Sequence, residues 1–137
     1  NSSNLDFPRH LGEAMTGVGL LLRLQLGQRP ATTPILDAHA KLLAASPPRI
    51  DRQWGGDQYA WYYATYALHE FGAPCQDPWE SELRKAVVLT QARRGDESGS
   101  WDPIGPWGAA MGRVCATAMM ALTLECPYRY PRALEAR

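Results

Sequence analysis

Apolar residues recur at helical spacing in five stretches of this chain, and no stretch alternates apolar and polar residues as a strand would. The first stretch runs from residue 8 to residue 26 and is followed by Gly27, a residue type that favours helix ends. Because its apolar residues cover more than one face, the pattern predicts a mostly buried helix. These residues are Met15, Val18, Leu20, Leu21, Leu22, Leu24 and Leu26.

Capping residues bound the second and third predicted helices. The second follows Thr33-Pro34, where a threonine cap precedes a proline at the first helical position, and it ends at Pro47-Pro48. The third begins after a cap at Asp57 and ends at Gly72.

The last two predicted helices complete an all-α chain. The fourth begins with a cap at Asp77 followed by proline, and it runs through Gln91, with Arg93 and Arg94 at its negative end. The fifth runs over residues 108–125 and is stopped by Pro127. Its small residues favour close packing: Ala109, Ala110, Gly112, Ala116 and Ala118.

A repeat of about fifty residues underlies these helices. Thr16, Thr65 and Thr117 occupy similar contexts at separations of 49 and 52 residues, and Trp54 and Trp101 are 47 residues apart. A period of this length that holds two helices predicts an array of helical hairpins. We expect the odd helices, rich in small and aromatic residues, to form an inner layer and the more charged even helices to form an outer layer.

Two glycine-tryptophan turns fall in phase with this repeat. The first runs from Gln91 to Pro103 and contains Gly99 and Trp101. The second, more degenerate turn lies at residues 51–56 and contains Gln53 and Trp54. A glutamine followed by a Gly-Ser-Trp turn resembles the QW motif of the squalene cyclase and terpene cyclase/prenyltransferase superfamily.

The resemblance extends over residues 11–125 and implies a partial α/α toroid. In such families the turn pins the outer helices, with the tryptophan stacked near the glutamine, so it implies a structural role for Gln91 and Trp101 and, more weakly, for Gln53 and Trp54. A complete toroid has about six hairpins of this size. Residues 1–137 are then a single α/α-repeat domain of about two and a half hairpins, part of a larger toroid or assembly.

The catalytic motifs of these families do not carry over to this chain. It lacks the Asp-x-Asp-Asp acid of class II cyclases, the aspartate-rich metal motif of class I synthases, the zinc-ligand setting of prenyltransferases and the Gly-Cys-Gly-Glu-Gln sequence of thioester domains. We therefore interpret the chain as a non-catalytic module for binding or assembly. The alternative is an isoprenoid-handling cyclase-type enzyme whose catalytic acid lies outside this chain, and a carbohydrate-active toroid is a distant third.

The third predicted helix carries the main candidates for a ligand site. Tyr59, Tyr62 and Tyr66 share one face with His69, and in the resembling enzymes such aromatics line the cavity and stabilise cations. A buried aromatic stripe is the favoured interpretation.

Three further candidates each have a more ordinary interpretation. For Asp57 we favour the role of a helix cap over that of a general acid. Trp107 could lie at the rim of a cavity or act as a hydrophobic staple. Arg113 pairs with Asp57 or Glu70, or it holds an anionic ligand. The acidic turn of Asp96, Glu97 and Asp102 is expected to be solvated charge, although paired carboxylates also serve glycoside cleavage.

The composition limits the classes of partner that this chain is expected to bind. Fourteen basic and fourteen acidic residues balance, which gives no electrostatic footprint for nucleic acid. The three cysteines have no CxxC spacing, and we expect neither a metal site nor a cofactor. No uninterrupted apolar run is long enough to span a bilayer, so we expect no transmembrane segment, and no signal peptide is visible. Expected partners are a second copy, the missing half of a toroid, or an apolar or isoprenoid ligand. The sequence leaves the compartment open.

Overall fold

The computed structural model describes residues 13–50, 56–72 and 75–129 of the chain. The described residues form five helices and no strand, so the all-α prediction is confirmed for them. The helices are α1 (Glu13–Gln25), α2 (Ile35–Ala45), α3 (Gln58–Phe71), α4 (Gln76–Thr90) and α5 (Gly108–Arg129). The predicted start of the first helix and the turn with Gln53 and Trp54 lie outside the described residues, as do residues 130–137.

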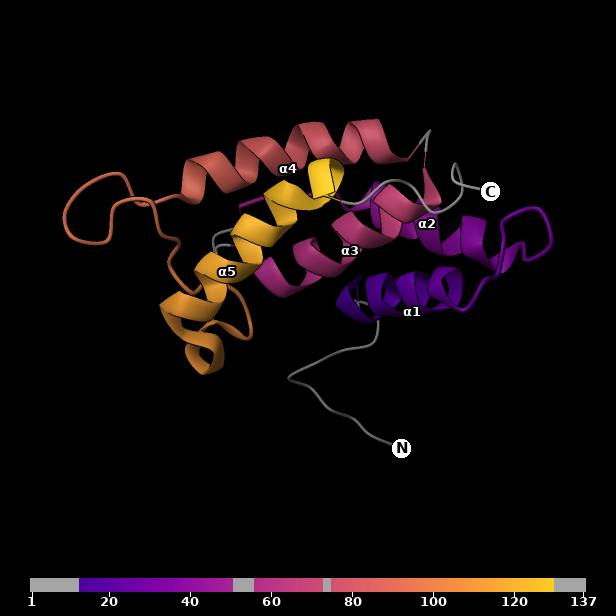
Figure 1. The fold of residues 1–137 in the computed structure, drawn as a ribbon, viewed down its shortest axis with the longest axis horizontal. Helices are drawn as coiled ribbons and strands as arrows, with labels where there is room; N and C mark the ends of the chain where they lie inside the picture. The colour runs from indigo at the N-terminus through magenta and orange to yellow at the C-terminus, as the bar shows by residue number, and fades with distance from the viewer. Residues whose placement is uncertain (1–12, 51–55, 73–74, 130–137) are drawn as a thin grey trace.

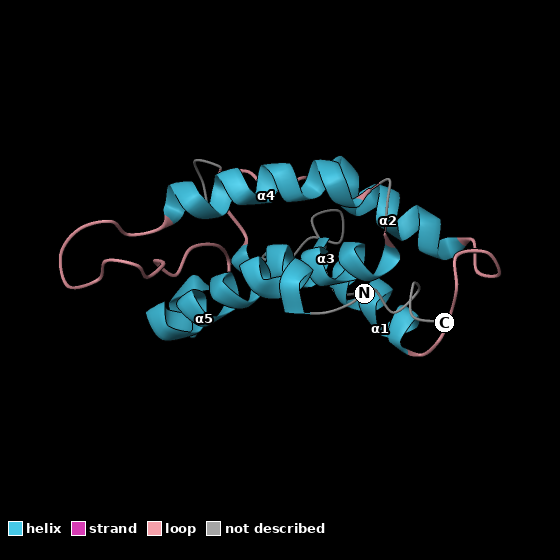
Figure 2. Ribbon diagram, turned by 45° about the horizontal axis from the view of Figure 1, so that its top comes forward, coloured by secondary structure: helices cyan, strands magenta, loops and turns pink. Residues whose placement is uncertain are grey.

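The five helices lie in two layers. In Figure 2, α2 and α4 follow one another along one side, and α5, α3 and α1 lie side by side on the other. The middle helix of the second layer, α3, packs against all four other helices (Figure 1). A layer of odd-numbered helices covered by even-numbered ones therefore exists, and α3 is its centre.

The prediction of a mostly buried first helix is wrong. Only Gly17 and Leu20 of α1 are buried, and they point toward the rest of the molecule. The opposite face is exposed, with 66% of Met15, 57% of Leu22 and 81% of Leu26 accessible. Of the apolar stripe that predicted a buried helix, Leu20, Leu21 and Leu24 therefore lie in or against the core, whereas Met15, Leu22 and Leu26 face away from it.

Close approach of two backbones fixes the contact between α1 and α3. A Cβ atom added to Gly17 would lie 2.9 Å from the backbone nitrogen of Ala64, a distance that real Cβ atoms essentially never show. Gly17 thus lets α1 lie directly on α3, whereas Gly19 on the same helix faces open space.

The predicted caps are confirmed at α3 and corrected at α2 and α4. Asp57 caps α3 by accepting a hydrogen bond from the Ala60 amide at 3.0 Å, and Gly72 ends the helix. At α2 the backbone carbonyl of Thr33, with no side-chain cap at Pro34, accepts the first hydrogen bond. Helix α4 begins one residue before Asp77, which therefore lies in the first turn and is not the cap.

Helix α5 departs most from its prediction. It is broken at Gly112, whose φ of 68° and ψ of 171° leave the helical region, and it continues through Pro127 to Arg129. Of the small residues expected to pack closely, Ala116 is buried, whereas Ala109, Ala110 and Ala118 are exposed and Gly112 is half-buried.

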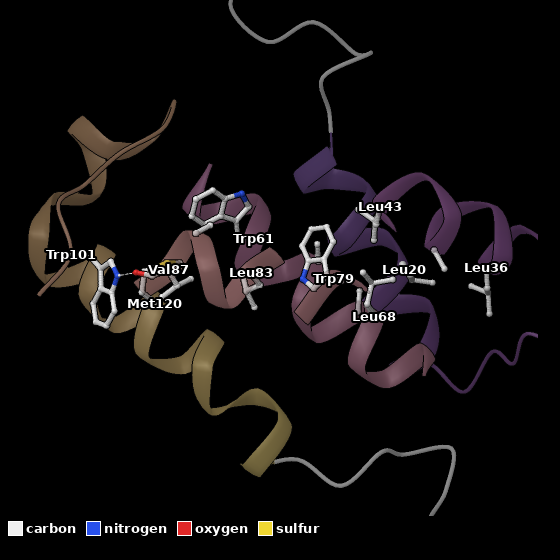
Figure 3. Packing of buried hydrophobic residues seen from close by; sticks show 14 residues of the cluster. Leu20, Leu36, Leu43, Trp61, Leu68, Trp79, Leu83, Val87, Trp101 and Met120 are labelled. Atoms are coloured by element: carbon white, nitrogen blue, oxygen red, sulfur yellow. Dashed lines mark hydrogen bonds between the residues drawn. The ribbon is translucent and has the colours of Figure 1, made fainter. Parts of the chain in front are cut away.

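The core lies between the two layers. Figure 3 shows its larger side chains along the length of the molecule, from Leu36 on α2 to Trp101 in the loop before α5. Two indoles reach across the layers and find polar partners. Trp79 Nε1 donates to the Thr65 hydroxyl at 2.9 Å, and Trp101 Nε1 donates to the Val87 carbonyl at 2.8 Å.

Candidate functional site

The loop between α4 and α5 is held at its base by Gln91 and Trp101. These two residues form an isolated antiparallel bridge, and the Gln91 side chain donates to the Gly99 carbonyl at 3.0 Å. Trp101 is 6% exposed, and its backbone amide donates to the Thr117 hydroxyl on α5. The three residues predicted to build this turn are therefore brought together, and the turn joins α4 to α5.

Arg113 fastens the same loop from the other side. Its guanidinium donates to the Ser100 hydroxyl at 2.9 Å and forms ion pairs with Glu97 (3.0 Å) and Asp102. Arg113 therefore has internal partners, as predicted, but they are neither Asp57 nor Glu70. Both carboxylates are largely exposed, as expected for this acidic turn. Because Arg113 forms ion pairs with both carboxylates, we assign it a structural role in holding this loop.

Gln58 is a buried polar residue that the sequence interpretation missed. Its side-chain nitrogen donates to the Asp102 carbonyl at 3.0 Å, and its side-chain oxygen accepts from the Ile104 amide at 3.2 Å. A fully buried glutamine with both ends paired binds the first turn of α3 to the loop before α5. The only sequence signal is a polar residue just inside a capped helix, which most often faces solvent.

The predicted tyrosines gather on one face of α3. Tyr62 and Tyr66 rings lie with centroids 4.8 Å apart, and Tyr63 contacts Tyr59 at 4.8 Å and Tyr62 at 5.0 Å. Trp107 extends the row beside Tyr59 at 6.2 Å. All four tyrosines are half-buried, and Trp107 is 41% exposed. Tyr63 was missed, although its place four residues after Tyr59 could have indicated it.

The tyrosine hydroxyls have partners within the protein. Tyr66 donates to the Leu122 carbonyl of α5 at 3.1 Å. Burial raises the pKa of Tyr59, with a further contribution from its hydrogen bond with Tyr63. This is the packed aromatic stripe favoured above, although it is only half-buried. His69 leaves the row, because it is buried against α4 with Nδ1 3.1 Å from the Gln76 side-chain nitrogen.

Two cavities are lined by described residues, and none of the four tyrosines of the row lines either of them. A cavity of about 270 Å³ lies between α1, the end of α2 and the start of α3, and Glu13, Arg49 and Asp57 line it. Burial raises the pKa of Asp57, and hydrogen bonds from the Ala60 and Tyr59 amides oppose that rise. Asp57 is the one predicted ligand residue that lines either of these two cavities of the described structure.

The second cavity, of about 330 Å³, lies between α3, α4 and α5. Its walls are mostly apolar, with Leu83 and Val88 on α4 facing Leu124 on α5. Arg84 donates to the Tyr128 hydroxyl at 3.1 Å, which joins the two walls. This space can hold an apolar group, and no sequence pattern indicated it.

No protein-family model, curated protein or solved structure matches the chain. Among the described residues, no group of three or more histidine, cysteine, aspartate or glutamate side chains is placed to hold a metal ion. Helix α5 alone in the described ranges is long and apolar enough to cross a membrane by length and composition, a test that core helices of soluble proteins also pass.

Proposed function

We propose that this chain is a non-catalytic α/α-repeat module that assembles through the two ends of its layer of odd-numbered helices. The observation that carries the proposal is the exposed apolar face on each terminal helix. On α1 this face contains Met15 and Leu22 and continues to Leu26 just after the helix, and on α5 it contains Val114, which is 85% exposed.

Two features favour assembly over exposure to water. Large side chains that lie three, four or seven residues apart form a continuous strip on a helix, and contiguous apolar strips of this kind mark interaction sites. The middle helix, in contrast, shows no comparable strip because α1 and α5 lie against it. The terminal helices thus expose the kind of surface that is covered elsewhere in the same layer.

We also propose that the module is related to the QW-type α/α toroids, with α1, α3 and α5 as inner helices and α2 and α4 as outer ones. Support comes from the two helix layers and from the Gln91–Trp101 bridge, which joins an even helix to the following odd helix. A partial toroid has unpaired ends, which agrees with the exposed faces.

Sedimentation velocity over a wide range of protein concentration tests the assembly proposal. We expect the weight-average sedimentation coefficient to rise with concentration, because each added contact removes apolar surface from water. A coefficient that stays at the monomer value over the whole range would refute self-assembly.

A second candidate function is the handling of an apolar ligand such as an isoprenoid. The mostly apolar cavity between α3, α4 and α5 favours it, with Arg84 at the wall for an anionic end. The test is the melting temperature with a prenyl diphosphate, with inorganic diphosphate as control. A rise with the prenyl compound alone supports this candidate, and equal melting temperatures in both contradict it.

A further inference from the structure

The repeat places the residues of α1, α3 and α5 in register, and this register identifies which face of each helix meets its neighbour. Aligning the three threonines puts Met15, Ala64 and Ala116 in one row, each one residue before its threonine. Ala64 and Ala116 are buried, and the backbone of Ala64 lies against α1. Met15 is exposed, although it occupies the same position of the repeat.

The residues that follow the three threonines form a second row, in which burial decreases from α1 to α5. Gly17 is buried against α3, and Tyr66 is half-buried and bonded to Leu122 of α5. Ala118, the third member of this row, is exposed. The first row therefore faces the preceding odd helix and the second row faces the following one.

Among the described helices, α1 and α5 each lack one neighbour that the repeat provides to α3. In the described ranges no helix precedes α1 over Met15, and none follows α5 over Ala118. The two free faces also differ in side-chain size: α1 presents the long side chains of Met15 and Leu22, whereas α5 presents the short ones of Ala118 and Ala121, with Val114 exposed one turn before them. Ridges of large residues pack into grooves over small ones.

We infer that copies of this chain join head to tail, with the free face of α1 in one copy packed on the free face of α5 in the next. This contact continues the α1–α3 interface already present within each copy, and the inference rests on the proposed assembly function. A contact between two different faces is heterologous, so it builds either a closed ring or an open chain of copies.

Two single substitutions test the pairing of faces. Met15→Glu places a charge on the α1 face, and Ala118→Glu places one on the α5 face; both sites are exposed, so folding is preserved and is checked by circular dichroism. Matched controls lie on the exposed side of α2, namely Leu42→Glu and Ala38→Glu. We expect each end variant to sediment as a monomer while both controls associate as the wild type does.

Mixing the two end variants gives the decisive result. Met15→Glu retains an intact α5 face and Ala118→Glu retains an intact α1 face, so the mixture forms heterodimers at concentrations where neither variant associates alone. Labelling one variant with a fluorophore and following its sedimentation detects them. Absence of heterodimers from the mixture overturns the head-to-tail contact.

The other outcomes separate this inference from the proposed function. If the wild type associates and Ala118→Glu still does so, α1 faces pair with each other, which overturns the inference and leaves assembly standing. If a control variant loses association, the contact lies on another surface, which likewise overturns the inference and leaves assembly standing. A wild type that stays monomeric but floats with phospholipid vesicles assigns the exposed apolar faces to lipid and overturns both.

Discussion

Replacing Trp101 with alanine is expected to remove a large part of the molecule's stability. The indole joins α4 and α5 through the core, where it lies beside Val87 and Met120 (Figure 3). Without it, the loop keeps its backbone bridge to Gln91 but loses the side chain that anchors it. The variant therefore measures how much the side chain contributes beyond the backbone turn.

The magnitude follows from burial and from what the missing indole leaves behind. Truncation of a buried tryptophan to alanine costs about 3–5 kcal/mol, including the cavity. The Val87 carbonyl loses its indole donor and keeps only a share of the Thr90 hydroxyl, which lies 3.1 Å from it and 2.9 Å from the Ala86 carbonyl, so the weakened acceptor places the cost toward the upper end of this range. Trp101→Phe keeps most of the ring and loses the hydrogen bond, and about 1–2 kcal/mol is expected.

Urea unfolding followed by far-ultraviolet circular dichroism gives the free energy of unfolding, because five tryptophans would complicate fluorescence. All variants are compared at one low protein concentration, since association stabilises the folded state. Trp107→Ala is the control, at 41% exposure, and should cost less than about 1 kcal/mol. A loss below about 1 kcal/mol for Trp101→Ala would refute the organising role of this turn.

Three more predictions follow from other sites. Gly17→Ala should destabilise the protein by about 1–3 kcal/mol, because the added Cβ meets the α3 backbone. Gly19→Ala places its Cβ in open space and should stabilise the protein by up to about 1 kcal/mol. Equal effects of the two substitutions on urea unfolding would contradict the close crossing of α1 and α3. Burial raises the folded-state pKa of Asp57. The free energy of unfolding of the wild type, relative to that of Asp57→Asn, should therefore be highest in acid and should fall as the pH rises through that pKa. A difference between the two proteins that does not change with pH would count against this. Burial raises the pKa of Cys126 to about 12, so mass spectrometry after alkylation should find exposed Cys115 modified in the native protein and Cys126 only on unfolding, and early labelling of Cys126 would disagree.

Local chemistry explains which helix ends could be predicted from the sequence. The cap at Asp57 and the terminators at Gly27 and Gly72 depend on adjacent backbone groups, and they lie where predicted. Pro127 shows the limit of such rules, because α5 continues through it. The family relationship and the toroid stay predictions.

Burial could not be predicted from the apolar pattern alone. The apolar stripe of α1 is typical of a core helix in sequence, yet Met15 faces outward because none of the other described helices covers it. The opposite error occurred at Gln58, a polar residue whose burial depends on backbone groups more than forty residues away. The partners of Arg113 were missed because loop geometry, not sequence spacing, brings Glu97 and Asp102 to it.

The position of α3 sets a lower limit on how short this array can be. In long repeat proteins each unit touches only its neighbours, so units can be removed one at a time from an end. Here α3 packs against every other helix, and loss of either end would uncover one of its sides. Deleting one hairpin therefore removes part of the core that the five described helices share, so the described fold cannot be shortened by a hairpin without exposing α3.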